Sequence, residues 1–574
     1  MDNTNILDEL NQQQCSVCKS DKNILLTACP GSGKTRTIIH RLAYIQDKFQ
    51  DSQMYNIAIT YTNRAADEIF TRIENMGIDT SSIWTGTIHQ FCMNFIIRPY
   101  AMYSSRLNKG YHIIDEYTQK KYCYEIADAL GIRLKYNEKP FIHENLKIEY
   151  EKRLLKNREI DFDMILELSL DLLKNNVFIA ENISRVTRSI HVDEYQDTNE
   201  LQYLILAEIV KANKNINIVF VGDVNQAIFG NLGGVAKSKK ELEYLFQVPF
   251  ENMYLSGCYR STQNIVNYYI NFETEKTSIE SVSKYRDEVG VISYNNSIDK
   301  NELVYEISRI IQEQLKIGVP AEEICVVAPQ WGRIFDISNK LRKLLPNVNF
   351  DAPDISPFKY DPMNPFYIIA HLLFTKSGKH VTLRKKISNE FIDILKNEYK
   401  IFVPEDYDYY NLLSVINRVD TTCNNGIDIY KVAVNNVFSS INVKLQDYNE
   451  LYQVYELFLD KTKERIKNYK LSTDFEDICS FFVEKHGVVI NTIHGVKGEE
   501  YTTVIGFCLL NGIIPHWDYI YKEELKPLRH NETNKLLYVL MSRAKKNLYL
   551  FSETGRKTSN GNFLSQTDEL RCLS

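Results

Sequence analysis

The chain has 574 residues with 44% hydrophobic and 25% charged residues, an ordinary composition for a globular protein of more than one domain. The net charge of −6 excludes a protein that coats DNA through overall positive charge, although a local basic groove stays compatible with it. No run approaches the roughly 20 apolar residues that a membrane helix needs, and the 11 cysteines are scattered along the chain. We therefore expect a cytoplasmic protein with reduced thiols and no membrane contact.

A glycine-bearing segment near the N-terminus carries the strongest local signal. Residues 24–27 are apolar and predict a buried strand, residues 37–42 have a helical pattern, and between them stands Ala28-Cys29-Pro30-Gly31-Ser32-Gly33-Lys34-Thr35. Small residues let successive backbone N–H groups face a phosphate, and the helix N-terminus adds partial positive charge. Lys34 can reach the β and γ oxygens, and the Thr35 hydroxyl can ligate Mg²⁺. A Gly-Lys-Thr triplet alone occurs by chance, and Ala28 replaces the usual first glycine, but the strand and the helix around the loop predict a nucleotide site.

A second predicted strand ends in two acids. Residues 190–192 are apolar or neutral, and Asp193 and Glu194 follow directly. At the C-terminal end of a strand beside a phosphate loop, one carboxylate can hold Mg²⁺ and the next can orient or deprotonate the attacking water. The alternative is a pair of acidic turn residues without a catalytic role.

The rest of the chain alternates between α/β and helical character. Short apolar runs at residues 57–60, 218–221, 324–328, 488–491, 503–507 and 547–551 predict further strands. We expect a first lobe from residues 1–95 and 187–255 with a helical insertion at 96–186. We expect a second lobe from residues 256–334 and 485–574 with a mostly helical insertion at 335–484.

The order of the motifs resembles the UvrD/Rep/PcrA group, the superfamily 1A DNA helicases that move 3′ to 5′. The stretch Asn491-Thr492-Ile493-His494-Gly495-Val496-Lys497-Gly498-Glu499-Glu500-Tyr501 is similar to the family pattern T-x-H-x-x-K-G-x-E-[FY], and residues 223–230, 256–261 and 532–544 complete the series. The resemblance covers nearly the whole chain. It implies an α/β fold of two RecA-like P-loop NTPase lobes, each with a mostly helical insertion, that hold ATP and Mg²⁺ in the cleft between them and DNA across their tops.

The resemblance further implies a nucleotide site shared between the lobes. Gln14 would read adenine with its paired donor and acceptor, Tyr259 would stack on the base, and Glu500 would meet the ribose. Arg260 and Arg543 would reach the γ-phosphate from the second lobe, so that closure of the lobes couples hydrolysis to movement. The expected catalytic residues are Lys34, Thr35, Asp193, Glu194, Gln226, Arg260 and Arg543, with Thr35 and Asp193 as metal ligands. The expected nucleotide-binding residues are Gln14, Ala28, Cys29, Pro30, Gly31, Ser32, Gly33, Lys34, Thr35, Arg36, Tyr259 and Glu500.

The resemblance also implies a track for single-stranded DNA or a single-strand/duplex junction. Tyr61 stands where the family has a base-stacking aromatic, and stacking on bases tolerates any sequence, so we expect no sequence-specific recognition. The expected DNA-binding residues are Tyr61, Thr62, Asn63, Thr87, His89, Phe229, Thr492 and His494.

Three stretches depart from the family pattern. The third motif of the family continues as Y-G-W-R-G, whereas this chain has Phe229-Gly230-Asn231-Leu232-Gly233, which lacks the second aromatic and its arginine. One stacking platform is then missing, and we expect weak or non-processive unwinding. Cys258 replaces the usual asparagine before Tyr259, and residues 351–358 do not reproduce the pattern F-F-E-x-x-E-I-K-D.

Three functions compete at this point. The first is an ATP-dependent, DNA-stimulated 3′-to-5′ translocase and helicase in DNA repair or antiviral defence. The second is a defence subunit similar to the helicase partner of Gabija-type systems, activated by DNA ends and paired with a separate OLD-type nuclease; the short second insertion favours it. The third is a non-catalytic DNA-binding scaffold, which the complete set of Lys34, Asp193, Glu194 and Arg543 disfavours.

Overall fold

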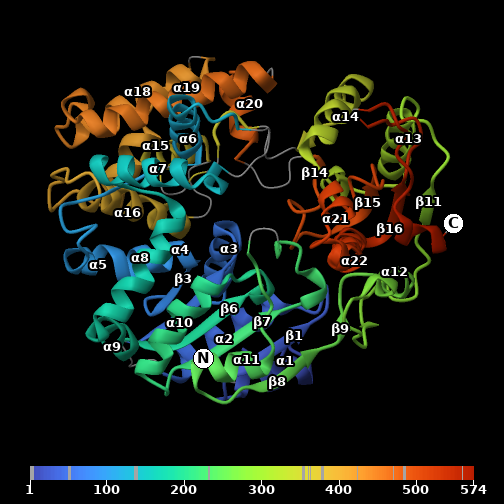
Figure 1. The fold of residues 1–574 in the computed structure, drawn as a ribbon, viewed down its shortest axis with the longest axis horizontal. Helices are drawn as coiled ribbons and strands as arrows, with labels where there is room; N and C mark the ends of the chain where they lie inside the picture. Colours follow the sequence, from blue (N-terminus) through green and yellow to red (C-terminus); the bar gives the residue numbers. More distant parts are fainter. Residues whose placement is uncertain are drawn as a thin grey trace.

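The computed structural model describes residues 6–49, 54–114, 116–134, 140–230, 233–351, 356–359, 361, 364–375, 381–422, 424–469, 471–482, 487–558 and 560–573. Two six-stranded sheets, both parallel throughout, form the centres of two lobes, and two helical insertions lie together beside them (Figure 1). The expected α/β fold with two RecA-like lobes is confirmed.

The first lobe is built on a sheet with the order β3-β2-β6-β7-β1-β8. Side chains alternate between two helical layers: Leu25 packs toward α10, whereas Ile24 and Leu26 pack toward α1 and α2. Helices on both faces explain why these strands are almost continuously apolar. The strands are β1 (Ile24–Ala28), β2 (Tyr55–Thr60), β3 (Ile83–Thr87), β6 (Thr187–Asp193), β7 (Asn217–Gly222) and β8 (Glu251–Leu255). The helices are α1 (Gln12–Lys19), α2 (Lys34–Lys48), α3 (Asn63–Asn75), α4 (Ile88–Phe91), α10 (Glu200–Ala212) and α11 (Lys239–Phe246).

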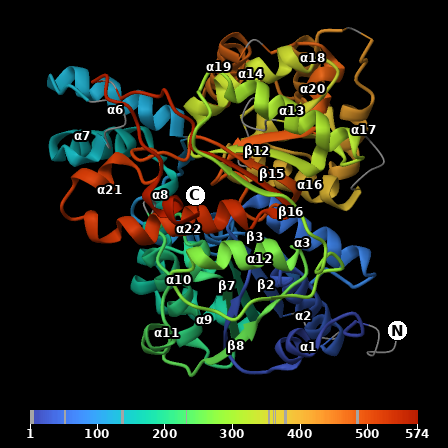
Figure 2. The same ribbon diagram turned by 90° about the vertical axis from the view of Figure 1, so that its right-hand side faces the viewer.

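The second lobe repeats this plan with the strand order β11-β16-β15-β12-β14-β13. One face packs on α13 and α14, and the other packs on α12 and α22, which Figure 2 shows on the side of the first lobe. The strands are β11 (Ile292–Asn295), β12 (Ile324–Ala328), β13 (Phe350–Asp351), β14 (Val488–Thr492), β15 (Tyr501–Gly506) and β16 (Ala544–Phe551), with a separate small pair of β9 (Gly257–Cys258) and β10 (Glu280–Ser281). The helices are α12 (Gln263–Tyr269), α13 (Leu303–Lys316), α14 (Trp331–Leu344), α21 (Trp517–Tyr521) and α22 (Arg529–Met541).

Both insertions are mainly helical. The first lies between β3 and β6 and contains the π-helix η1 (Cys92–Ile97), α5 (Arg98–Tyr100), β4 (His112–Ile113), α6 (Glu116–Leu130), α7 (Glu144–Asn157), β5 (Glu159–Ile160), α8 (Phe162–Asn175) and α9 (Val177–Arg185). The second lies between β13 and β14 and contains α15 (Pro365–Phe374), α16 (Val381–Asn397), α17 (Tyr409–Asn417), α18 (Gly426–Ser440), α19 (Asn449–Tyr469) and α20 (Phe475–Ser480). In the described ranges no helix is both long and apolar enough to cross a membrane.

Short 3-10 helices complete the architecture. Two of them follow strands at the lobe junction, namely η4 (Tyr195–Asp197) and η5 (Val224–Gln226). The others are η2 (Ala101–Tyr103), η3 (Pro140–Ile142), η7 (Ile270–Phe272), η8 (Ala321–Glu323), η10 (Leu445–Asp447), η11 (Lys526–Leu528) and η12 (Asp568–Leu573).

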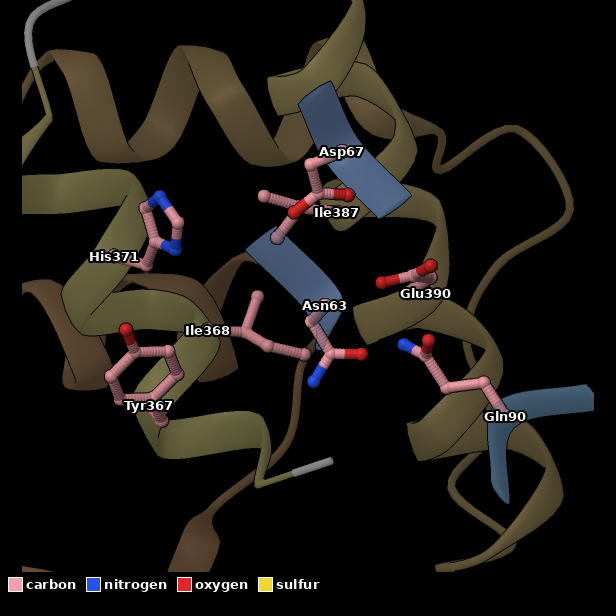
Figure 3. A pocket seen from close by; sticks show the side chains of 8 residues that line it. All are labelled: Asn63, Asp67, Gln90, Tyr367, Ile368, His371, Ile387 and Glu390. Atoms are coloured by element: carbon pink, nitrogen blue, oxygen red, sulfur yellow. The ribbon is translucent and has the colours of Figure 1, made fainter. Parts of the chain in front are cut away.

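The second insertion is tied to the first lobe and to its insertion by ion pairs. Arg98 Nη2 lies 2.7 Å from Glu398 Oε1, and both side chains are largely buried. Lys386 Nζ lies 3.2 Å from Asp67 Oδ1 on α3. A small pocket lies at this junction, and Figure 3 shows its side chains converging from α3, α4, α15 and α16. It is lined by Asn63, Asp67, Gln90, Tyr367, Ile368, His371, Ile387 and Glu390.

We predict that Arg98→Ala destabilises this junction. Removal of one partner from a buried ion pair leaves the other charge without compensation and costs about 3 kcal/mol or more. If the affected part melts as a unit of about 200 residues, the melting temperature should fall by roughly 6–12 °C in differential scanning calorimetry. Arg72→Ala is the matched control, because Arg72 pairs with Glu68 on the exposed side of α3 at 2.5 Å, and such pairs contribute at most about 1 kcal/mol. Equal shifts for the two variants would contradict a stabilising role of the buried pair.

Candidate functional site

The loop after β1 has the geometry of a phosphate cradle. Gly31 and Gly33 adopt φ values of 72° and 79°, which side chains other than glycine rarely tolerate, and Lys34 begins α2 directly after them. The hydroxyl of Ser32 is buried and has no hydrogen-bond partner within the described residues. A buried hydroxyl of this kind next to a helix N-terminus fits an anionic ligand.

Two acids face this loop from the end of β6. Lys34 Nζ lies 3.6 Å from Glu194 Oε1, and the backbone N–H of Glu194 donates to Asp193 Oδ1 at 2.9 Å. Burial and the neighbouring Glu194 raise the pKa of Asp193 to about 7. Burial alone would raise the pKa of Glu194, but the positive charges of Lys34 and Lys497 outweigh it and hold that pKa at about 2. The two lysines thus favour the ionised form of Glu194, which a proton acceptor requires.

Arg543 approaches the same place from the second lobe. Its guanidinium is 1% exposed and donates to Gln226 Oε1 at 2.8 Å, to the carbonyl of Val539 at 3.0 Å and to the carbonyl of Glu499 at 3.2 Å. In the part of the chain that the structure describes, no carboxylate lies within ion-pair distance of it. Burial and the neighbouring Arg260 lower its pKa to about 9. A buried cation without an acidic partner is expensive, so this arrangement favours an anion at the seam between the lobes.

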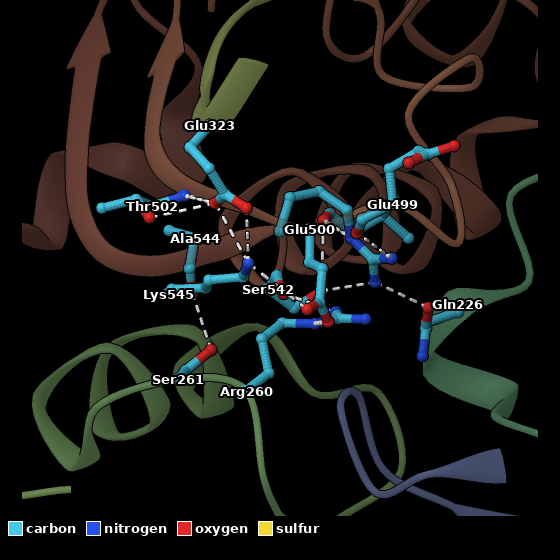
Figure 4. Close-up of polar contacts among 12 residues, drawn as sticks. Gln226, Arg260, Ser261, Glu323, Glu499, Glu500, Thr502, Ser542, Ala544 and Lys545 are labelled. Atoms are coloured by element: carbon cyan, nitrogen blue, oxygen red, sulfur yellow. Dashed lines mark hydrogen bonds and ion pairs between the residues drawn. The ribbon is translucent and has the colours of Figure 1, made fainter. Parts of the chain in front are cut away.

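Arg260 connects the second lobe to the phosphate loop. The N–H of Tyr259 donates to the carbonyl of Gly31 at 2.8 Å, and a Cβ on Gly31 would come within 2.5 Å of the Arg260 Cβ. The Arg260 side chain donates to Glu500 Oε2 at 2.9 Å and to the Ser542 carbonyl at 2.9 Å (Figure 4). Glu500 thus holds Arg260 in place at one border of the cradle. Cys258 is buried here, with its sulfur 3.1 Å from the position of a Gly31 Cβ.

The residues expected around the base lie beside the loop. Gln14 Nε2 donates to the Ser32 carbonyl at 3.0 Å, and Gln14 Oε1 accepts from the backbone of Asn11. Asn11 Nδ2 also donates to the hydroxyl of Tyr259 at 2.6 Å, which positions that ring. Arg36 pairs with Glu9 at 2.6 Å. Sequence reasoning missed Asn11, although the capping box formed by Asn11 and Gln14 is a readable helix-start signal.

Three of the expected DNA-binding residues form one aromatic group above the seam. The ring of Tyr61 is 43% exposed and stacks on Phe229 with centroids 4.7 Å apart and planes at 24°. The ring of His494 from the second lobe lies 5.5 Å from Phe229. The group therefore joins the two lobes on the side where a strand of DNA is expected. Asn231 and Leu232, the departure from the family pattern, lie outside the described residues.

Three other residues expected to bind DNA are threonines whose hydroxyls accept hydrogen bonds from backbone N–H groups of the protein. The hydroxyls of Thr62 and Thr87 cap α3 and α4 by accepting from the N–H groups of Ala65 and Gln90. The hydroxyl of Thr492 is buried and accepts from the N–H of Gly495 at 3.0 Å.

His89 and Asn63 are the last two of these expected contacts. Burial lowers the pKa of His89 to about 4, which favours the neutral ring at physiological pH. Asn63 lines the pocket at the second insertion, and its Oδ1 is buried without a partner in the described ranges.

Comparisons with known proteins identify the family. The family model described as the UvrD/REP helicase N-terminal domain matches residues 10–148 and 135–244, and the one described as the UvrD-like helicase C-terminal domain matches residues 374–554. These matches cover more than half of the chain, which therefore belongs to the UvrD/REP helicase family. It is an ATP-dependent DNA helicase of the UvrD type.

The chain also resembles individual proteins of known name. A protein named ATP-dependent DNA helicase PcrA from Staphylococcus epidermidis is 24% identical over 657 aligned positions, which include 98% of this chain and 87% of that relative. The protein of the same name from Staphylococcus aureus is 24% identical over 638 positions, with 96% of this chain and 84% of the relative covered. Similarity at this level extends through both lobes and both insertions.

We predict that Gly31→Ala impairs nucleotide binding. The added methyl group meets Arg260 Cβ at 2.5 Å, and the backbone has a φ of 72°, so both the cradle and the second-lobe arginine must shift. The affinity for a fluorescent ATP analogue should fall at least about tenfold. The matched control is Gly77→Ala, where φ is 73° but no atom lies within 4 Å of the new Cβ. Its backbone strain of about 1–2 kcal/mol should leave nucleotide affinity unchanged; equal losses in both variants would show that strain, not the cradle, is responsible.

Proposed function

We propose that this chain is a single-stranded-DNA-stimulated translocase and helicase that moves 3′ to 5′ and hydrolyses ATP at the seam between its lobes. One observation carries the proposal: Glu194 pairs with Lys34 on one lobe, Arg543 of the other lobe bonds Gln226 and acts on Glu194, and Arg260 lies against the phosphate loop at Gly31. The family and the order of its motifs support the direction of movement.

The seam supports the following division of labour. Backbone N–H groups of the loop and Lys34 bind the β and γ oxygens, while Thr35 and Asp193 provide the oxygen ligands that Mg²⁺ prefers. When bound there, Mg²⁺ would offset phosphate charge. Glu194 accepts the proton of the attacking water. Arg260 and Arg543 stabilise negative charge that develops on the phosphoryl group. Because both arginines belong to the second lobe, their engagement requires the lobes to close, and release reopens them.

Lys34→Ala should abolish catalysis. Loss of one donor to a developing anion typically costs 10²–10³ in rate, so we expect hydrolysis with single-stranded DNA to fall at least about 100-fold. Lys48→Ala at the other end of α2 is the control, since Lys48 is exposed and pairs with Asp21 at 3.5 Å. Wild-type turnover in Lys34→Ala would exclude this mechanism. Loss of hydrolysis in this variant would exclude the third candidate, a non-catalytic scaffold.

The DNA-stimulated rate of the wild type should fall as salt rises, because phosphate contacts release counterions.

A second candidate is a defence subunit that hydrolyses nucleotide in response to DNA ends and works with a separate OLD-type nuclease. The relative lengths favour it: the alignment with the Staphylococcus epidermidis protein extends over 657 positions, more than the 574 residues of this chain, so segments of that relative have no counterpart here.

Circular DNA separates the two candidates. A translocase on single strands should be stimulated by circular single-stranded DNA as strongly as by linear DNA, and should displace a strand from a duplex with a 3′ tail but not from one with a 5′ tail. An end-activated hydrolase should respond to linear duplex DNA and stay at its basal rate with circular DNA. Strand displacement on 5′ tails alone would contradict the proposed direction.

A further inference from the structure

Lys497 reaches across the seam and forms a buried ion pair with the first lobe. It lies between β14 and β15, and its Nζ pairs with Asp197 Oδ2 and donates to the backbone carbonyl of Gln226 at 2.7 Å. The side chains of Lys497 and Asp197 are 7% and 1% exposed. In such a dry environment, an ammonium and a carboxylate fix each other's positions, because separation leaves an uncompensated charge.

The same ammonium also touches the aromatic group. Lys497 Nζ lies 5.1 Å from the centroid of the Phe229 ring, within the range of a cation–π contact. Phe229 in turn stacks on Tyr61 and lies beside His494. Lys497 therefore contacts the expected DNA-stacking group on one side and the catalytic seam on the other.

The catalytic side of this contact is the segment that ends in Gln226. Gln226 Nε2 donates to Asp223 Oδ2 at 2.8 Å, and its Oε1 accepts from Arg543. The Lys497 ammonium holds the backbone of this residue through its carbonyl oxygen. A displacement of Lys497 would therefore shift Gln226 and its contact with Arg543.

We propose that Lys497 is a positioning residue that transmits the state of the Tyr61–Phe229 stack to the hydrolytic centre. The two rings are stacked at 4.7 Å, so a DNA base that inserts between them must separate them. Movement of Phe229 removes the ring beneath the ammonium and shifts the balance of its contacts with Asp197 and with the carbonyl of Gln226. A change in the stack thus reaches Gln226 and Arg543 in the seam through one side chain. The inference rests on the proposed DNA-stimulated hydrolysis.

The test is the stimulation factor, defined as the ATP hydrolysis rate with saturating oligo(dT) divided by the rate without DNA. In Lys497→Met, which keeps a long side chain but removes the charge, the factor should fall at least about fivefold relative to the wild type. ATP affinity should change by less than about threefold. Asp197→Asn removes the other charge with little change in shape and should lower the factor similarly. The double variant should lose no more than the stronger single variant, as expected for groups that act as a unit.

Controls separate positioning from simple stabilisation. Lys340→Met removes an exposed lysine of α14 that pairs with Asp336 at 2.7 Å, and should leave the factor unchanged. A purely structural role of Lys497 would lower both rates in proportion and leave their ratio at the wild-type value, which would overturn the inference. If Lys497→Met does not fold, Asp197→Asn decides the question by the same ratio. A wild-type protein without any stimulation would instead contradict the proposed function itself.

Discussion

The organisation of this protein depends on a buried positive charge that lacks an acidic partner. Arg543 is almost completely buried, and its guanidinium is satisfied by an amide oxygen, two backbone carbonyls and a hydroxyl rather than by a carboxylate in the described ranges. Burying such a cation is costly, and an anion bound beside it would offset part of that cost. Because Arg543 lies between Gln226 of one lobe and the body of the other, we expect an anion to bind at the lobe seam.

The fold explains why acidic and basic side chains meet at the seam. Parallel strands bring β1 and β6 to the same edge of the first sheet, so the phosphate loop and the acids Asp193 and Glu194 meet there. The second lobe presents α22 and the segment after β9 to that edge, which brings in Arg543 and Arg260. Hydrogen bonds across the seam, such as the one from Arg543 to Gln226, contribute only roughly 1–3 kcal/mol net, so they can exchange for contacts with a ligand without unfolding either lobe.

Local patterns made part of this structure predictable. The strand, loop and helix around Lys34 and the strand that ends in Asp193 are continuous in sequence, and the α/β fold follows from alternating apolar runs. The residue pairs that join the second lobe to the first do not follow from local patterns. Lys497 and Asp197 are 300 residues apart, and Arg543 and Gln226 are 317 residues apart, so neither spacing nor periodicity indicates that they meet. Resemblance to the family suggested Arg543 and Gln226, but the pairing of Lys497 with Asp197 emerged only from tertiary geometry.

The most direct measurement is a crystal structure with Mg²⁺ and a non-hydrolysable ATP analogue bound. We expect Arg543 to leave Gln226 Oε1, and both Arg543 and Arg260 to donate to γ-phosphate oxygens at about 2.8 Å, the distance of charge-assisted hydrogen bonds, with Lys34 on the opposite side. A structure in which the triphosphate is held by the first lobe alone, with Arg543 still bonded to Gln226 and Arg260 still bonded to Glu500, would contradict it.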